Sequence, residues 1–250
     1  MQIGVIGAAE AAGSEARLDR LAEAEAQGYA AIWLAVPDGL PGAAGRSLFP
    51  AARLAQRTEA VRIGMACPLP ENLHPLRVAE EIAVLDIQSG GRVEWAPGNA
   101  PDSAEGLEIV LRAWRGEAFA HQGDRYAFPE LRCLPRPEQR PHPRLWLDFP
   151  GALPAGASPG QCGRWLEGRL APEAAHPDPE ALSGGGSLAV VCPVSAGDPG
   201  GPDGWQEGLA QLEARWKPDW LLVWPERDAD EALAARTQRR FAEVAAGFSA

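Results

Sequence analysis

The chain has 250 residues, of which 46% are hydrophobic, and a formal net charge of −11. That hydrophobic share can build a substantial core, and the acidic charge argues against non-specific binding to nucleic acid or to an anionic membrane. No run reaches the roughly 18–20 apolar residues of a membrane span, and the N-terminus lacks the basic region of a signal peptide. We therefore expect a cytoplasmic protein.

Four cysteines lie far apart in the chain, with no C-x-x-C pair and no histidine at the spacing of a metal ligand: Cys67, Cys133, Cys162 and Cys192. A disulfide framework or a zinc site would need such a pattern. We expect buried thiols and no metal centre.

Strand-like and helix-like segments alternate along the chain. Apolar runs predict strands at 2–7, 30–36, 60–66, 92–96, 144–149, 187–194 and 219–224. Helical periodicity and stop signals predict helices at 15–27, 47–59, 76–88, 103–115, 159–167, 205–215 and 228–246. Residues 166–172 are a weaker candidate for an eighth strand. The proline-rich segment 116–143 is predicted to be a loop, and so are the proline- and glycine-rich runs of 172–204 on either side of the 187–194 strand.

Regular β-α alternation predicts parallel strands joined by helical crossovers. This order favours a closed (β/α)8 TIM barrel over an open doubly wound sheet. We expect one compact barrel domain over residues 1–250.

The run HPLRVAEEIAVLDIQSGGRVEWAPG, residues 74–98, resembles the bacterial luciferase-like flavin-dependent monooxygenase family. Further segments are similar to the family in the same order: RLAEAEAQGYAAIWLA, AARLAQRTEAVRIGMA, and LEARWKPDWLLVWP near the end. The resemblance is close over roughly the first 150 residues. It implies a barrel with a flavin site at the carboxyl ends of the strands. It also implies FMN or, in some branches, F420, and a homodimer or a heterodimer with a related barrel.

The resemblance assigns positions at three strand ends. After the second strand, where the family has an acidic residue and histidine, this chain has Asp38 in a Pro-Asp-Gly turn and no imidazole. The end of the third strand, Ala66 and Cys67, corresponds to the wall beside the flavin ring, where the family often has a cis peptide.

Two more positions correspond to the flavin phosphate. After the fourth strand the family has Gly-x-Gly-Arg-Gly, and this chain has Gly98 and Asn99 followed by alanine. An asparagine amide replaces a charged arginine fork, which weakens the phosphate grip. After the fifth strand Ser158 retains part of a phosphate-binding turn, and it equally suits a helix N-cap.

Other side chains are predicted to be structural. His74 fits the start of a helix, whereas His121, His142 and His176 are predicted to be exposed on loops. The strand tryptophans are predicted core residues, and Trp95 or Trp146 could instead point into the barrel mouth to stack on a ring or to plug the pocket.

Two functions therefore remain open. The first is an FMN- or F420-dependent oxidoreductase of the monooxygenase type, acting on a small molecule through a divergent site. The second is a non-catalytic barrel, either a dimer partner subunit or a binder of a flavin derivative. The missing imidazole, the missing phosphate arginine and the short loops motivate the second reading.

Overall fold

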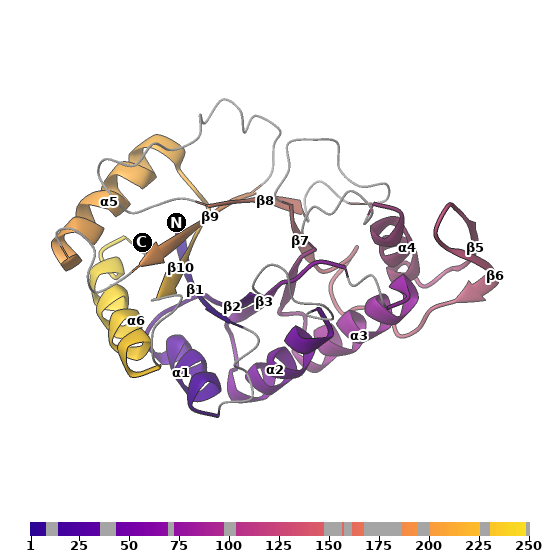
Figure 1. Ribbon diagram of the computed structural model, residues 1–250, viewed down its shortest axis with the longest axis horizontal. Helices are drawn as coiled ribbons and strands as arrows, with labels where there is room; N and C mark the ends of the chain where they lie inside the picture. Colours follow the sequence, from indigo (N-terminus) through magenta and orange to yellow (C-terminus); the bar gives the residue numbers. More distant parts are fainter. Residues whose placement is uncertain are drawn as a thin grey trace.

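The computed structural model describes residues 1–8, 15–35, 44–69, 73–97, 104–147, 157, 162–167, 187–194, 201–225 and 231–248. These residues form a closed barrel in the strand order β1-β10-β9-β8-β7-β4-β3-β2, with every neighbouring pair parallel. Helices lie around its outside, α1 to α4 in chain order along one side and α5 and α6 along another (Figure 1). The predicted (β/α)8 fold is confirmed.

The barrel strands are β1 (Gln2–Ala8), β2 (Ala31–Ala35), β3 (Arg62–Ala66), β4 (Val93–Ala96), β7 (Arg144–Leu147), β8 (Cys162–Glu167), β9 (Ser187–Val194) and β10 (Trp220–Pro225). The helices are α1 (Glu15–Ala26), α2 (Ala44–Arg57), α3 (Pro75–Gln88), α4 (Ala104–Trp114), α5 (Gly201–Trp216) and α6 (Glu231–Ala245). Within the described residues, no helix is both long and apolar enough to cross a membrane.

The predicted helix at 159–167 is wrong, because residues 162–167 form strand β8. This strand pairs with both β7 and β9 and closes the barrel. Gly163 lies in tight packing inside this strand, since a Cβ there would lie 2.4 Å from the Trp146 ring and 3.0 Å from the Ser187 carbonyl. The position therefore needs a residue without a side chain in tight sheet packing, which local helical periodicity does not reveal.

The predicted loop at 116–143 is only partly correct, because it contains an antiparallel hairpin of β5 (Ala118–Gln122) and β6 (Ala127–Arg132). The hairpin extends from the outside of the barrel beside α4 (Figure 1). The carboxylate of Glu105, in the first turn of α4, interacts with His121 Nε2 at 2.9 Å and accepts the N–H groups of Arg125 and Tyr126. These contacts lower the pKa of Glu105, the bond to His121 most strongly, although partial burial opposes the shift.

Two separate apolar clusters follow from strand alternation. The outer cluster joins the strands to the helices and includes Ile63, Trp95 and Leu145. The inner cluster fills the barrel lumen and includes Trp33 and Trp146.

Arg92 connects several elements at the amino-terminal end of the barrel. Its guanidinium donates to the carbonyls of Ala55, Thr58, Val61 and Ser89. One arginine thus holds the α2–β3 connection against the α3–β4 connection.

We predict that Gly64→Ala destabilises the fold. A Cβ at Gly64 would lie 1.9 Å from the Trp33 ring, whereas a Cβ at Gly247 meets only the Val244 carbonyl at 4.0 Å. Overpacking should lower the free energy of unfolding by about 1–3 kcal/mol in Gly64→Ala. Urea denaturation measures the change, and Gly247→Ala is the control. Equal stability of the two variants would contradict the packing described.

Candidate functional site

The carboxyl ends of the first four strands present a row of inward-facing alanines. Ala8, Ala35, Ala66 and Ala96 are neighbours in the strand register, and we call them the alanine shelf. Ala35 and Ala96 are buried, while Ala8 and Ala66 are half-buried. Barrel enzymes carry out their chemistry at this end of the strands, and small side chains here leave space for a planar group.

Two tryptophans close the lumen beneath the shelf. The rings of Trp33 and Trp146 meet edge to face, with centroids 6.4 Å apart, and each is about 1% exposed. Gly64 and Gly163 provide the room for these rings. We call the pair the tryptophan floor. Trp146 is a core residue, as predicted for the strand tryptophans.

A buried carboxylate holds the floor in place. Glu94, one step deeper than Ala96 on β4, is 2% exposed and accepts from Trp146 Nε1 at 2.6 Å and from Arg62 Nε at 2.8 Å. The Arg144 guanidinium lies 5.5 Å from the centroid of the Trp146 ring. Trp146 is thus oriented by a charged hydrogen bond and a cation–π contact. Alternation in Val93-Glu94-Trp95 was the sequence signal that could have placed Glu94 inside.

The segment after β3 continues along β4 beside the shelf. Cys67 donates its N–H to the Ala96 carbonyl at 3.0 Å, and Leu69 donates to the Pro97 carbonyl at 3.3 Å. The cis peptide implied for Ala66–Cys67 is wrong: among the described residues the cis bonds are Leu134–Pro135 and Arg140–Pro141. Ala66 ends β3 and Cys67 follows it beside β4, and their contact with a flavin ring stays a prediction.

Trp95 faces the opposite way from the barrel mouth. It belongs to the outer cluster, where its ring meets that of Trp114 edge to face at 6.2 Å. The alternative in which Trp95 stacks on a ligand is therefore wrong. Val93 and Trp95 point outward so that Glu94 and Ala96 can point inward.

Four other candidate positions lie outside the described residues: Asp38, Gly98, Asn99 and Ser158. Of the predicted site residues, the structure describes Ala66 and Cys67. The phosphate contacts of Gly98, Asn99 and Ser158 and the catalytic role of Asp38 remain predictions.

Of the three histidines that the structure describes, one has the predicted role and one is buried where exposure was predicted. His74 is the N-cap of α3, where its side chain accepts from the Leu76 N–H at 3.3 Å, as predicted. The prediction that His142 is exposed is wrong. Its side chain is 2% exposed and stacks on Trp114, and burial lowers its pKa. His121 is held by Glu105 in the hairpin and is only half-buried.

The cysteines form no disulfide, and the described residues contain no group of three or more metal-ligating side chains. Burial raises the pKa of Cys162 to about 11, against the attraction of Arg144, and that of Cys192 to about 12. These two thiols stay protonated at neutral pH and are poor nucleophiles.

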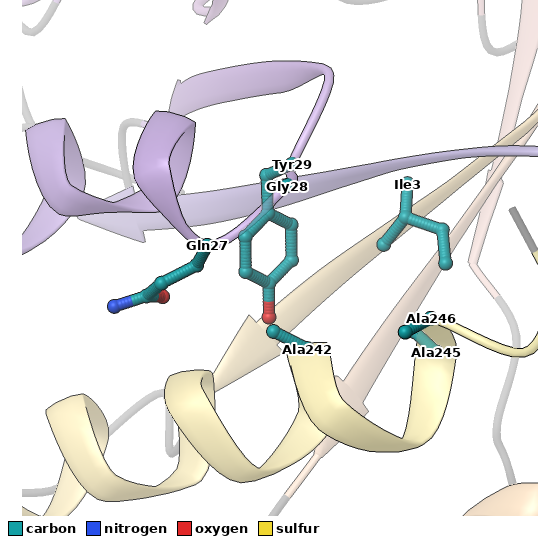
Figure 2. A pocket seen from close by; sticks show the side chains of 7 residues that line it. All are labelled: Ile3, Gln27, Gly28, Tyr29, Ala242, Ala245 and Ala246. Carbon is teal, nitrogen blue, oxygen red and sulfur yellow. The ribbon is translucent and has the colours of Figure 1, made fainter.

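A separate pocket of about 200 Å³ lies at the opposite, amino-terminal end of the barrel, between β1 and the end of α6 (Figure 2). It is lined mainly by apolar groups, and its two polar side chains are already engaged with α6. The Tyr29 hydroxyl donates to the Gln238 carbonyl, and Gln27 accepts from the Gln238 amide. Burial raises the pKa of Tyr29, so this pocket offers no acid or base at neutral pH.

A closed barrel of parallel strands defines the class: this is a TIM-barrel protein, and enzymes of this fold carry their ligand site at the carboxyl ends of the strands. The model of the luciferase-like monooxygenase family matches residues 4–105. This part of the chain is therefore similar to that family.

Two curated proteins are related in sequence. An uncharacterized protein of Sinorhizobium fredii is 36% identical over 152 residues, which cover 52% of this chain and 44% of that protein. The oxygenase component of the flavin-dependent trigonelline monooxygenase of Acinetobacter baylyi is 30% identical over 115 residues, covering 38% and 32%. This chain thus matches less than half the length of either relative.

Solved structures share the whole fold. Monooxygenase RslO1 of Streptomyces bottropensis superposes with a TM-score of 0.75 at 21% identity over 100% of both chains. The FMN complex of the oxygenating constituent of 3,6-diketocamphane monooxygenase from Pseudomonas putida gives 0.66 at 15% identity, covering 99% and 98%. The coenzyme F420-dependent tetrahydromethanopterin reductase of Methanopyrus kandleri gives 0.67 at 13% identity, covering 97% of each.

We predict that Glu94→Ala destabilises the barrel by about 2–4 kcal/mol, because it removes the carboxylate from both Arg62 and the Trp146 indole N–H. Urea denaturation is the measurement. The matched control is Glu243→Ala, which removes an exposed ion pair with Arg240 and should cost about 0.5 kcal/mol or less. Similar losses in the two variants would show that the buried contact is not special.

Proposed function

We propose that this barrel binds FMN with the flavin ring on the alanine shelf and acts as the oxygenase component of a flavin-dependent monooxygenase. The observation that carries the proposal is the shelf itself: four adjacent strands of the barrel end in alanines, next to the tryptophan pair that fills the lumen. The match of residues 4–105 to the luciferase-like family model and the FMN complex of a protein with the same fold support this choice.

The described residues fit a flavin ring. The shelf offers methyl groups to one edge or face of the ring, and the Cys67 backbone is fixed beside it. The tryptophan floor prevents water from reaching the ring from below, which favours reactions that water would otherwise intercept. Reduced flavin supplies two electrons, so that one oxygen atom of O2 enters the substrate and the other leaves as water. Gly98, Asn99 and Ser158 are the proposed contacts of the phosphate.

A flavin binder without turnover is the second candidate. The residues of the shelf and of the floor carry no imidazole, and Glu94 is engaged by Trp146 and Arg62. Nothing in this set can donate or accept a proton at the shelf. Asp38 is the proposed acid–base group of the catalytic version, and the non-catalytic version, a dimer partner subunit or a binder of a flavin derivative, needs none.

Titration with FMN tests the binding that both candidates share. Quenching of flavin fluorescence should give a dissociation constant of about micromolar or below. F420 added in competition tests the alternative cofactor, and oxygen uptake with reduced FMN separates an oxygenase from a binder. Absence of binding to either cofactor would overturn the proposed function.

We predict that Ala66→Leu weakens FMN binding at least about tenfold, because the larger side chain would fill the shelf. Ala66 is half-buried, so the folded barrel should tolerate the change. Ala127→Leu, on the exposed surface of the hairpin, is the matched control and should bind as the wild type does. Unchanged affinity in Ala66→Leu would place the ring elsewhere.

We propose further that the face formed by α2 and α3 is a dimer interface with a second copy of the chain. Among the described large apolar side chains, three of the four exposed ones lie on these two helices: Phe49 is 80% exposed, Ile87 43% and Val84 38%. Beside them lies a groove of about 410 Å³ lined by apolar groups such as Leu48 and by charges of both signs.

The groove suits a self-complementary interface. Its apolar lining can receive the exposed Phe49 of the other copy, and a two-fold axis would bring Arg77 of one copy near the glutamates of the other. Exposed aromatic groups beside a groove are typical of interface centres.

We predict that Phe49→Ser shifts the protein towards a monomer, whereas Leu134→Ser does not. Leu134 is 57% exposed and lies after the hairpin, away from α2, so it is a matched surface control. Light scattering after size-exclusion chromatography measures the mass. A wild-type monomer at high concentration would refute the interface.

A further inference from the structure

We propose that Trp95 is a positioning residue: its indole N–H holds the Cys67 carbonyl and thereby fixes the Ala66–Cys67 wall of the site from outside the barrel. This inference rests on the proposed flavin site for its functional consequence. The structural part is independent of any ligand.

The Cys67 peptide is held by consecutive residues of β4. Trp95 Nε1 donates to the Cys67 carbonyl at 3.1 Å, and the Cys67 N–H donates to the Ala96 carbonyl at 3.0 Å. Strand β3 ends at Ala66, so the next carbonyl lies beyond the regular ladder. A side chain on β4 reaches around to satisfy it.

The donor is itself rigid. Trp95 is 1% exposed, and its ring packs edge to face against Trp114, which donates its own indole N–H to the Ala79 carbonyl of α3 at 3.0 Å. On its other side Trp114 stacks on His142, with centroids 6.3 Å apart. Trp95 therefore has little freedom to leave the Cys67 carbonyl, since its neighbours occupy the space around it.

The shelf depends on this arrangement because Ala66 directly precedes Cys67. The Cys67 carbonyl belongs to the peptide that joins Cys67 to Pro68. Without the Trp95 N–H this peptide has more freedom to rotate, and Cys67 can then shift beside the Ala66 methyl. A displacement of that size is enough to weaken the contact of a flat ring with the shelf.

The two tryptophans provide a matched pair of variants. Trp95→Phe removes an indole–carbonyl bond at the site wall, and Trp114→Phe removes a bond of similar length, equally buried, to α3. Both leave an aromatic ring in the same cluster. A second variant replaces Trp95 with 3-benzothienylalanine, in which sulfur takes the place of the N–H group. It keeps the shape of the indole ring and is the variant to measure if Trp95→Phe does not fold.

Two readouts are needed. The first is the FMN dissociation constant, expected to rise about tenfold in the Trp95 variants and to stay within about twofold of wild type in Trp114→Phe. The second is the rate of alkylation of Cys67 by iodoacetamide without flavin, followed on the Cys67 peptide by mass spectrometry. Cys67 is 6% exposed, so a loosened segment should react about tenfold faster or more.

The outcomes separate the two proposals. Faster Cys67 alkylation in the Trp95 variants alone supports the positioning role, even if the wild type fails to bind FMN and the proposed function falls. Equal effects of Trp95→Phe and Trp114→Phe on alkylation would reduce Trp95 to a packing residue. Unchanged alkylation in the Trp95 variants would overturn the inference.

Discussion

The contact between Trp33 and Trp146 inside the barrel is the constraint on which the site depends. Two indole rings cannot share the lumen unless the strands beside them lack side chains, and Gly64 and Gly163 meet that need. With the lumen filled, the space left at the carboxyl ends lies above the alanine shelf. Core packing thus fixes the side chains that lie next to the proposed flavin site.

The floor and the wall of the site are held by different means. Glu94 fixes Trp146 from within the lumen by a charged hydrogen bond, in a place where an unpaired carboxylate would be costly. Trp95 holds the Cys67 carbonyl from the helical layer outside. Glu94 and Trp95 are neighbours on β4 and act on opposite faces of the barrel wall. This short strand therefore connects the core to the proposed site.

The sequence predicted most elements because each has a strong local signal. Residues 76–88, for example, show a helical stripe that ends at Ser89-Gly90-Gly91, and α3 spans Pro75–Gln88. Prediction failed where long-range contacts outweigh local ones. Strand β8 exists because the barrel must close, and His142 is buried because Trp114 stacks on it. The hairpin was missed because its anchor, Glu105, lies on a different element.

By itself the sequence determined the alternation of strands and helices, and hence the closed parallel barrel and the resemblance to luciferase-like monooxygenases. It also placed Ala66 and Cys67 at a strand end. The tertiary structure alone decided which side chains face the lumen and which face the helices, because barrel closure sets the register of eight strands at once. That is why Trp146 could not be told from Trp95 beforehand, although one fills the lumen and the other braces the wall from outside.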